Sequence, residues 1–434
     1  MDVRPNKRLL AHVWIVCALS LFIDGYDLYI SSVAEPFINA FFHPSPFLIG
    51  LTQAAAPIGA ALGALLMGRV ADKVGRKSLL IVNLFFFIVI ALLSACAWDM
   101  TSLCVFRFLI GFGVGADYPI CAAYLAEVIP KNKSRQFIAA AMFVNCLASP
   151  VGAAVAWLLF QYHPTLDLWR WLFASGAIPA VVALLLRTKL PESFIWQAQQ
   201  KLQPRMPFLQ HYKKLVSPSL RRKTICMCLS WFFLDISYYG IGLFTPAVLR
   251  AVHILENADL LTAANDMLMS TLFVNLFVVL GAFSTIFVIA KVNPFQLQKM
   301  GFLLSFLGLL TLSFSNTVPD AFTSSMIFSG FILFNLFVNF GPGITTYLLP
   351  AELYPSDIKA TGHGVAASCG KMGAAIGTLL LPLLQFYIGI YYTVGILAMT
   401  LLLGWALTYL LSLETEQQQP IWNKDRSNHA LPTQ

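Results

Sequence analysis

Charged residues are scarce in this sequence. Only 11% of its 434 residues are Asp, Glu, Lys or Arg, whereas a soluble globular domain has about a quarter. The mean hydropathy is +0.74. Runs of roughly 20 apolar residues recur, and each is long enough to cross a bilayer as a helix. The short alternating segments of a membrane barrel are not seen. We therefore expect an all-α membrane protein.

Motifs for metals, nucleotides and redox chemistry are also missing. The eight cysteines lie within apolar runs or at their ends, and none has a Cys-x-x-Cys or zinc-site spacing. Gly111, Gly113 and Gly115 precede Asp117 inside an apolar run, so they do not belong to a strand–turn–helix nucleotide fingerprint. Glycines in a span instead allow close helix packing. We expect free thiols, no metal and no cofactor.

Twelve transmembrane helices are predicted from the apolar runs. The first run follows basic residues but is long and contains Asp24 and Asp27, so it is interpreted as a helix and not a signal peptide. One long hydrophilic connection, 188–223, divides the chain into a first half, 1–187, a second half, 224–413, and a tail, 414–434. The expected spans are 10–38, 45–70, 78–98, 102–127, 136–162, 168–187, 224–250, 263–291, 297–315, 321–349, 362–388 and 390–413.

The distribution of basic residues predicts the orientation. Alternate connections hold most of the Lys and Arg residues outside the spans, and such loops face the cytoplasm. Both termini and the central loop are therefore expected to be cytoplasmic, in the plasma membrane or, in a bacterium, the inner membrane. The net charge of +8 is explained by this topology, so the partner is a lipid bilayer and not nucleic acid.

The two halves resemble each other. AEVIP at 126–130 matches AELYP at 351–355, and the same offset relates Gly152 to Gly377. LFIDGYD at 21–27 is similar to FFLDISY at 232–238. Two pseudo-symmetric six-helix halves are typical of a transporter whose binding site lies between them.

Five charged residues lie near the middle of predicted spans: Asp24, Asp27, Asp117, Asp235 and Lys371. Each costs roughly 2.5–3.5 kcal/mol at that depth on insertion scales. A shared polar cavity would explain several charges at one level. The alternative is a set of structural ion pairs between helices. The acids outnumber the bases, however, so they cannot all be paired.

Helical spacing groups these residues by face. Asp24 and Asp27 are three residues apart and share a face. Trp231, Asp235 and Tyr239 are four apart and form one stripe, which could otherwise be aromatic packing between helices.

Two further features concern conformational change. Within GRVADKVGRK at 68–77, Asp72, Gly75 and Arg76 suit a latch that forms in one access state and breaks in the other. Arg107 begins the fourth span, where it either pairs with an intramembrane acid or orients the helix.

These motifs resemble the major facilitator superfamily, and within it the phosphate:proton symporter family. GRVADKVGRK resembles the superfamily signature between helices 2 and 3. GADYP at 115–119, WFFLDISYY at 231–239, VNFGPG at 338–343 and CGKMGA at 369–374 resemble elements of the symporters. The resemblance covers the whole chain.

The resemblance implies roles for particular residues. The expected anion contacts are Tyr118, Asn145, Trp231, Asp235, Tyr239 and Lys371. Asp24, Asp27 and Asp117 would handle protons. A gating or structural role is assigned to Asp72, Gly75, Arg76, Arg107, Glu127, Arg135 and Glu352. Three positions depart from the family pattern: Gly343 replaces an asparagine, Ala116 a glycine and Asn145 a glutamine.

The sequence therefore predicts a proton-coupled importer of a small solute that works by alternating access, as a monomer and not as an enzyme. Inorganic phosphate is the first candidate substrate, and an organic acid or a sugar is the alternative. A nutrient receptor that binds without transporting is a further possibility. An intramembrane aspartyl protease would need a GxGD motif, but GVGAD at 113–117 has one residue too many.

Overall fold

A computed structural model describes residues 7–129, 133–190, 192, 208–249, 260–355 and 358–418. Within these ranges every regular element is helical. The helices are α1 (Lys7–Phe42), α2 (Pro46–Val74), α3 (Arg76–Ala95), α4 (Met100–Val128), α5 (Ser134–Cys146), α6 (Ala148–Tyr162), α7 (Leu168–Ser175), α8 (Ala177–Thr188), α10 (Phe208–Leu215), α11 (Arg221–Gly242), α12 (Thr245–Leu249), α13 (Leu260–Val288), α14 (Pro294–Ser313), the 3₁₀ turn η3 (Ser315–Thr317), α15 (Asp320–Phe340), α16 (Pro342–Leu353), α17 (Lys359–Ile388) and α18 (Ile390–Gln418).

Twelve helical segments in the described ranges are long and apolar enough to cross a membrane. Each overlaps one of the twelve predicted spans, so the predicted fold class is confirmed. Three spans are interrupted, at Leu147, Gly176 and Gly341. Proline follows each interruption within a few residues, at Pro150, Pro179 and Pro342, and proline lacks the amide hydrogen that continues a helix.

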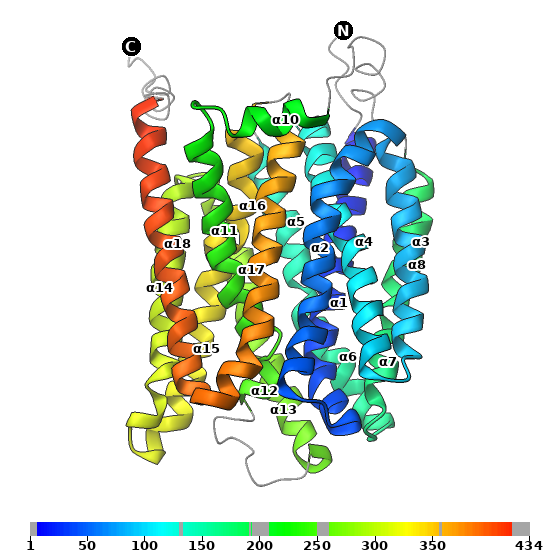
Figure 1. The fold of residues 1–434 in the computed structure, drawn as a ribbon, viewed down its shortest axis with the longest axis vertical. Helices are drawn as coiled ribbons and strands as arrows, with labels where there is room; N and C mark the ends of the chain where they lie inside the picture. Colours follow the sequence, from blue (N-terminus) through cyan, green and yellow to red (C-terminus); the bar gives the residue numbers. More distant parts are fainter. Residues whose placement is uncertain are drawn as a thin grey trace, which may run out of the picture.

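The central connection differs in one respect from the prediction. It was expected to be a hydrophilic loop, but it contains the helix α10. α10 lies across the face of the bundle at which α1 begins and α18 ends (Figure 1). We call this the α10 face. The basic side chains of Lys213 and Lys214 had made the segment look like a loop.

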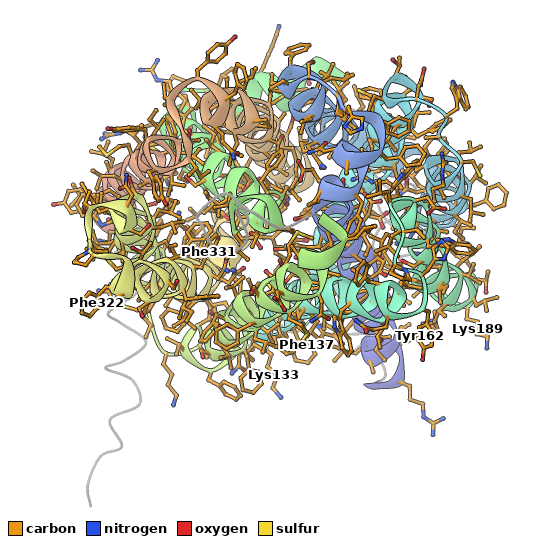
Figure 2. All side chains as sticks on the ribbon, turned by 90° about the horizontal axis from the view of Figure 1, so that it is seen from below. Lys133, Phe137, Tyr162, Lys189, Phe322 and Phe331 are labelled. Atoms are coloured by element: carbon orange, nitrogen blue, oxygen red, sulfur yellow. The ribbon has the colours of Figure 1, made fainter. Side chains whose placement is uncertain are left out.

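The helices form two groups, seen along their axes in Figure 2, with the early helices on one side and the late helices on the other. Across the middle, α2 packs against α17, and α5 and α6 pack against α13. The expected close packing at glycines is present on α4. A Cβ atom added to Gly111 or Gly115 would lie 2.0 Å from the carbonyl oxygen of Ala56 or Ala60 on α2. These glycines bring α4, and with it Asp117, against α2.

Candidate functional site

The predicted charged residues of the second half meet at the centre of the bundle. Lys371 of α17 is only 3% exposed. Its Nζ donates to the Tyr239 hydroxyl of α11 at 2.5 Å and lies 3.7 Å from Asp235 Oδ2. The same ammonium is 5.0 Å from the ring centre of Tyr118, on α4 of the other half. A buried cation thus faces both halves and is balanced by one carboxylate.

An aromatic wall adjoins this charge pair. The ring of Trp231 lies edge-on to Tyr347 at 6.3 Å and to His363 at 5.7 Å, between ring centres. His363 Nε2 is 3.1 Å from the carbonyl oxygen of Tyr347. Sequence reasoning selected Trp231 but missed Tyr347 and His363. Neither residue belongs to a charged motif that stands out in an apolar run.

A cavity lies between the halves beside Lys371. Its lining includes Tyr118 and Asn145 from the first half and Tyr238 and Tyr239 from the second. The Asn145 amide donates to the backbone oxygen of Leu21 at 2.5 Å. Asn145 therefore reaches the cavity, as the resemblance implies, but its NH₂ group is held by α1.

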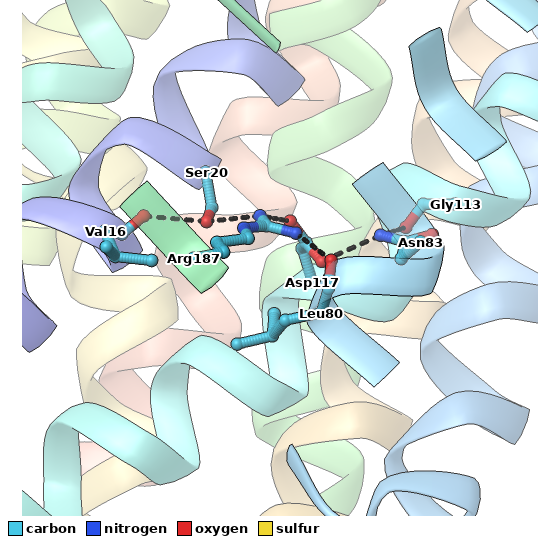
Figure 3. Close-up of polar contacts among 7 residues, drawn as sticks. All are labelled: Val16, Ser20, Leu80, Asn83, Gly113, Asp117 and Arg187. Atoms are coloured by element: carbon cyan, nitrogen blue, oxygen red, sulfur yellow. Dashed lines mark hydrogen bonds and ion pairs between the residues drawn. The ribbon is translucent and has the colours of Figure 1, made fainter. Parts of the chain in front are cut away.

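Asp117 is held by an arginine that sequence reasoning missed. Arg187 of α8 forms an ion pair with Asp117 and bonds to the carbonyl oxygen of Leu80. It also donates to the Ser20 hydroxyl at 2.5 Å. Asn83 donates to the other carboxylate oxygen of Asp117 at 2.8 Å (Figure 3). Arg187 stands at the end of its apolar run, next to the basic loop, where basic residues are common.

A second buried ion pair joins α4 to α1. Arg107 of α4 donates to Asp27 Oδ1 at 2.7 Å, and both side chains are buried. Of the two roles left open for Arg107, pairing with an intramembrane acid is therefore the one observed. Structural ion pairs, the alternative to a shared polar cavity, are thus present for three of the four acids, because Asp27, Asp117 and Asp235 each have a cation nearby.

Asp24 differs from these three acids. It lies on α1 between Ser20, which contacts Arg187, and Asp27, which contacts Arg107. It is buried, and its Oδ2 has no hydrogen-bond partner among the described residues. A proton can add to this carboxylate without breaking an ion pair.

Contacts join the halves on both sides of Lys371. Near the α10 face, the Arg135 guanidinium of α5 forms two hydrogen bonds, of 2.5 and 3.0 Å, with the Glu352 carboxylate of α16. Beyond Lys371, the Tyr29 and Tyr238 hydroxyls are 2.9 Å apart. Trp157, near the end of α6, donates to the side-chain oxygen of Asn265, near the start of α13, at 2.9 Å.

Part of the predicted latch cannot be placed. The side chains of Asp72, Arg76 and Glu127 lie outside the described residues. Gly75 separates α2 from α3 and has a φ of 101°, a backbone conformation that glycine adopts readily. This glycine allows the sharp turn within the GRVADKVGRK segment.

A twelve-helix membrane protein whose two halves close around buried charges has the architecture of a transporter. Comparison with known families agrees. The chain belongs to the Major Facilitator Superfamily, whose family model matches residues 17–378. It is therefore a multi-pass membrane transporter and not an enzyme.

Curated relatives cover most of the chain. It is 27% identical to the inorganic phosphate transporter 1-6 of Oryza sativa subsp. japonica, over 87% of this chain and 83% of that protein. It is 26% identical to the probable inorganic phosphate transporter 1-6 of Arabidopsis thaliana, over 95% of this chain and 93% of that protein.

Solved structures share the fold. The proton:xylose symporter XylE bound to 6-bromo-6-deoxy-D-glucose has a TM-score of 0.75 at 19% identity, covering 93% of this chain and 96% of that one. A partially occluded, inward-open form of XylE from E. coli also gives 0.75, at 17% identity, with 92% and 98% covered.

Proposed function

We propose that this protein imports inorganic phosphate together with protons by alternating access. The observation that carries the proposal is the buried Lys371, placed between the halves with hydroxyl and carboxylate groups around it. A buried cation is costly to maintain without a negative partner. A site that offers a buried cation to an incoming solute favours an anion. The relatives described as inorganic phosphate transporters support phosphate as that anion.

The same geometry gives a reason for proton coupling. In the structure Asp235 balances Lys371. An anion that enters beside Lys371 adds a second negative charge at a buried site, where unbalanced charge is strongly unfavourable. Protonation of Asp235, or a proton shared between Asp235 and phosphate, removes that repulsion. Substrate binding then requires a proton.

Asp24 provides a second place for a proton. It lies on α1 between the Asp117–Arg187 and Asp27–Arg107 pairs. Its electrostatic neighbours include Asp117 and Lys371, so a proton on Asp24 changes the balance at the substrate cation. We assign Asp24, Asp27 and Asp117 to proton coupling, and Tyr118, Asn145, Trp231, Asp235, Tyr239 and Lys371 to phosphate.

Alternating access would consist of rocking between the halves, with boundaries at about 1–187 and 224–413. Opening at the α10 face breaks the Arg135–Glu352 pair, and opening at the other face separates Tyr29 from Tyr238. We place the α10 face in the cytoplasm, because the basic connections of the chain belong to it. We propose that the monomer is the working unit, in the plasma membrane or a bacterial inner membrane.

An organic acid or a sugar is the competing substrate. Gly343 offers no side chain to a solute where the resemblance leads us to expect asparagine, and the Asn145 NH₂ group is occupied by Leu21. The wall of Trp231, Tyr347 and His363 would also suit a larger solute.

Competition distinguishes these substrates. Uptake of labelled phosphate by the reconstituted protein is measured with excess unlabelled phosphate, dicarboxylate or xylose, and phosphate alone is expected to compete. Lys371→Ala should raise the half-saturating phosphate concentration about 30-fold or more, as loss of a buried charge contact does. Lys299→Ala is the matched control, since Lys299 also lies over a tyrosine ring, 5.3 Å from the centre of Tyr409. Stronger competition by xylose or dicarboxylate would reassign the substrate.

A further inference from the structure

The polar residues of α1 continue well beyond the proton-coupling aspartates. Polar side chains recur at intervals of three or four residues along this helix, and so share one face. Five of them are buried: Ser20, Asp24, Asp27, Ser31 and Glu35. We call this row, Ser20, Asp24, Asp27, Ser31 and Glu35, the α1 polar row. Burial of such a row in a membrane helix is expensive unless it has a function.

The outer end of the row opens into a second cavity, separate from that beside Lys371. Ser31 and Glu35 of α1, Gln53 of α2 and Arg107 of α4 contribute to its lining. The Ser31 hydroxyl donates to Gln53 Oε1 at 2.9 Å, and Asn39 donates to the Glu35 carboxylate. This cavity lies in the first half, toward the end of α1 opposite the α10 face.

Arg107 connects the cavity with the proton-coupling residues. One of its nitrogens holds Asp27 at 2.7 Å, and the side chain also lines the cavity. Its Nε is buried and has no hydrogen-bond partner among the described residues, and the same holds for Asp27 Oδ2. Unpaired buried polar atoms of this kind are uncommon, and water is one group that can satisfy them.

We propose that Glu35 takes up protons from the face opposite the α10 face and passes them through this cavity to Asp27. Glu35 is the carboxylate of the α1 polar row farthest from Asp24. Glu35 follows Asp27 by eight positions, which is about 12 Å along the helix, and Ser31 lies midway. A proton added to the Glu35 carboxylate moves over water and hydroxyl groups to Asp27 Oδ2, and from there to Asp24. Each transfer leaves the donor ionised and the acceptor neutral.

The residues that line the cavity around Glu35 include one cation and several neutral side chains. From α4 the cavity is lined by the Arg107 guanidinium, and Cys104 lies on the same helix near Thr52. From α2 the lining is the neutral Thr52 and Gln53, and from α7 it is Phe173. Along α1 the nearest acid is Asp27. Arg107 is thus the cation between the two carboxylates, and proton transfer from Glu35 to Asp27 shifts the negative charge around it.

The role of Glu35 rests on the proposed proton coupling, and the experiment gives different results if only the Glu35 role fails and if the coupling itself fails. Proteoliposomes with a pH-sensitive dye report proton entry on addition of inorganic phosphate, and phosphate counterflow reports exchange without net proton movement. Glu35→Gln should slow proton-driven uptake about tenfold or more at external pH 7.5. The difference in uptake rate between Glu35→Gln and wild type should be smaller at external pH 5, where bulk protons reach Asp27 directly. Phosphate counterflow should stay within about twofold of wild type, because a residue that only transfers protons does not affect exchange.

Two further variants complete the test. Glu35→Asp keeps a carboxylate and should recover most of the rate. Asp167→Asn removes an acid between α6 and α7 that does not line the cavity, and should leave the pH profile unchanged. A wild-type pH profile in Glu35→Gln, or equal loss of counterflow and uptake, would overturn the role of Glu35. Wild-type protein that exchanges phosphate without moving protons would overturn the proposed coupling and this inference with it.

Discussion

Removal of Arg187 should leave the Asp117 carboxylate buried without its cation. Arg187 is 0% exposed and bonds to Asp117, Ser20 and the Leu80 backbone oxygen. Breaking a buried pair from one side costs about 3–5 kcal/mol. Arg187→Met fills a similar volume and should lower stability by about that amount. With an unfolding entropy near 2.1 cal/mol/K per residue, this corresponds to a Tm lower by about 3–5 °C.

The assay is thermal unfolding in detergent for Arg187→Met, Asp117→Asn and the double variant. Asp117→Asn removes the charge but keeps the Asn83 contact, so the double variant should be more stable than Arg187→Met alone. Two single losses that simply add in the double variant would refute the reasoning, because they would show no coupling between the residues. All three variants should also lose concentrative uptake if Asp117 couples protons.

Other predictions follow from the remaining contacts. Arg135→Glu should change the uptake rate about two- to fivefold, since the Arg135–Glu352 pair is partly exposed and such a pair contributes roughly 0.2–1 kcal/mol. Glu352→Arg in the same protein should restore the rate. Asp27→Asn should reduce accumulation about tenfold or more while counterflow continues; equal loss of both would contradict a coupling role. The Asp99 carboxylate accepts hydrogen bonds from Ser102, which lower its pKa. Its contribution to stability is present above the unfolded pKa of about 3.9 and lost as pH falls through the folded value. The Tm gap between wild type and Asp99→Ala should therefore shrink from pH 7 to pH 3; a constant gap would argue against the charged cap.

The fold was predictable because the bilayer imposes it. Long apolar runs and the AEVIP and AELYP repeats identify twelve helices in two related halves. The breaks at Leu147, Gly176 and Gly341 were missed, because hydropathy does not change where a helix bends within the membrane. α10 was missed because a short amphipathic helix on a surface has the composition of a loop.

The site was predictable where the chain places charge in an apolar run. Asp24, Asp27, Asp117, Asp235 and Lys371 stand out for that reason, and the structure brings four of them into buried ion pairs or contacts. Partners were harder to find. Arg187 lies at a helix end, where basic residues are common, and its pairing with Asp117 depends on how α8 packs beside α3 and α1. Tyr347 and His363 carry no charge signal, so only the packing of α16 and α17 identifies them.

The most direct test of the account is accumulation of labelled phosphate in proteoliposomes, with and without an inward proton gradient. We predict uphill accumulation with the gradient, downhill equilibration without it, and loss of accumulation in Lys371→Ala but not in Lys299→Ala. Accumulation that is unchanged when the gradient is abolished would contradict proton coupling. Absence of phosphate uptake by folded protein would contradict the assignment of Lys371 as a phosphate site.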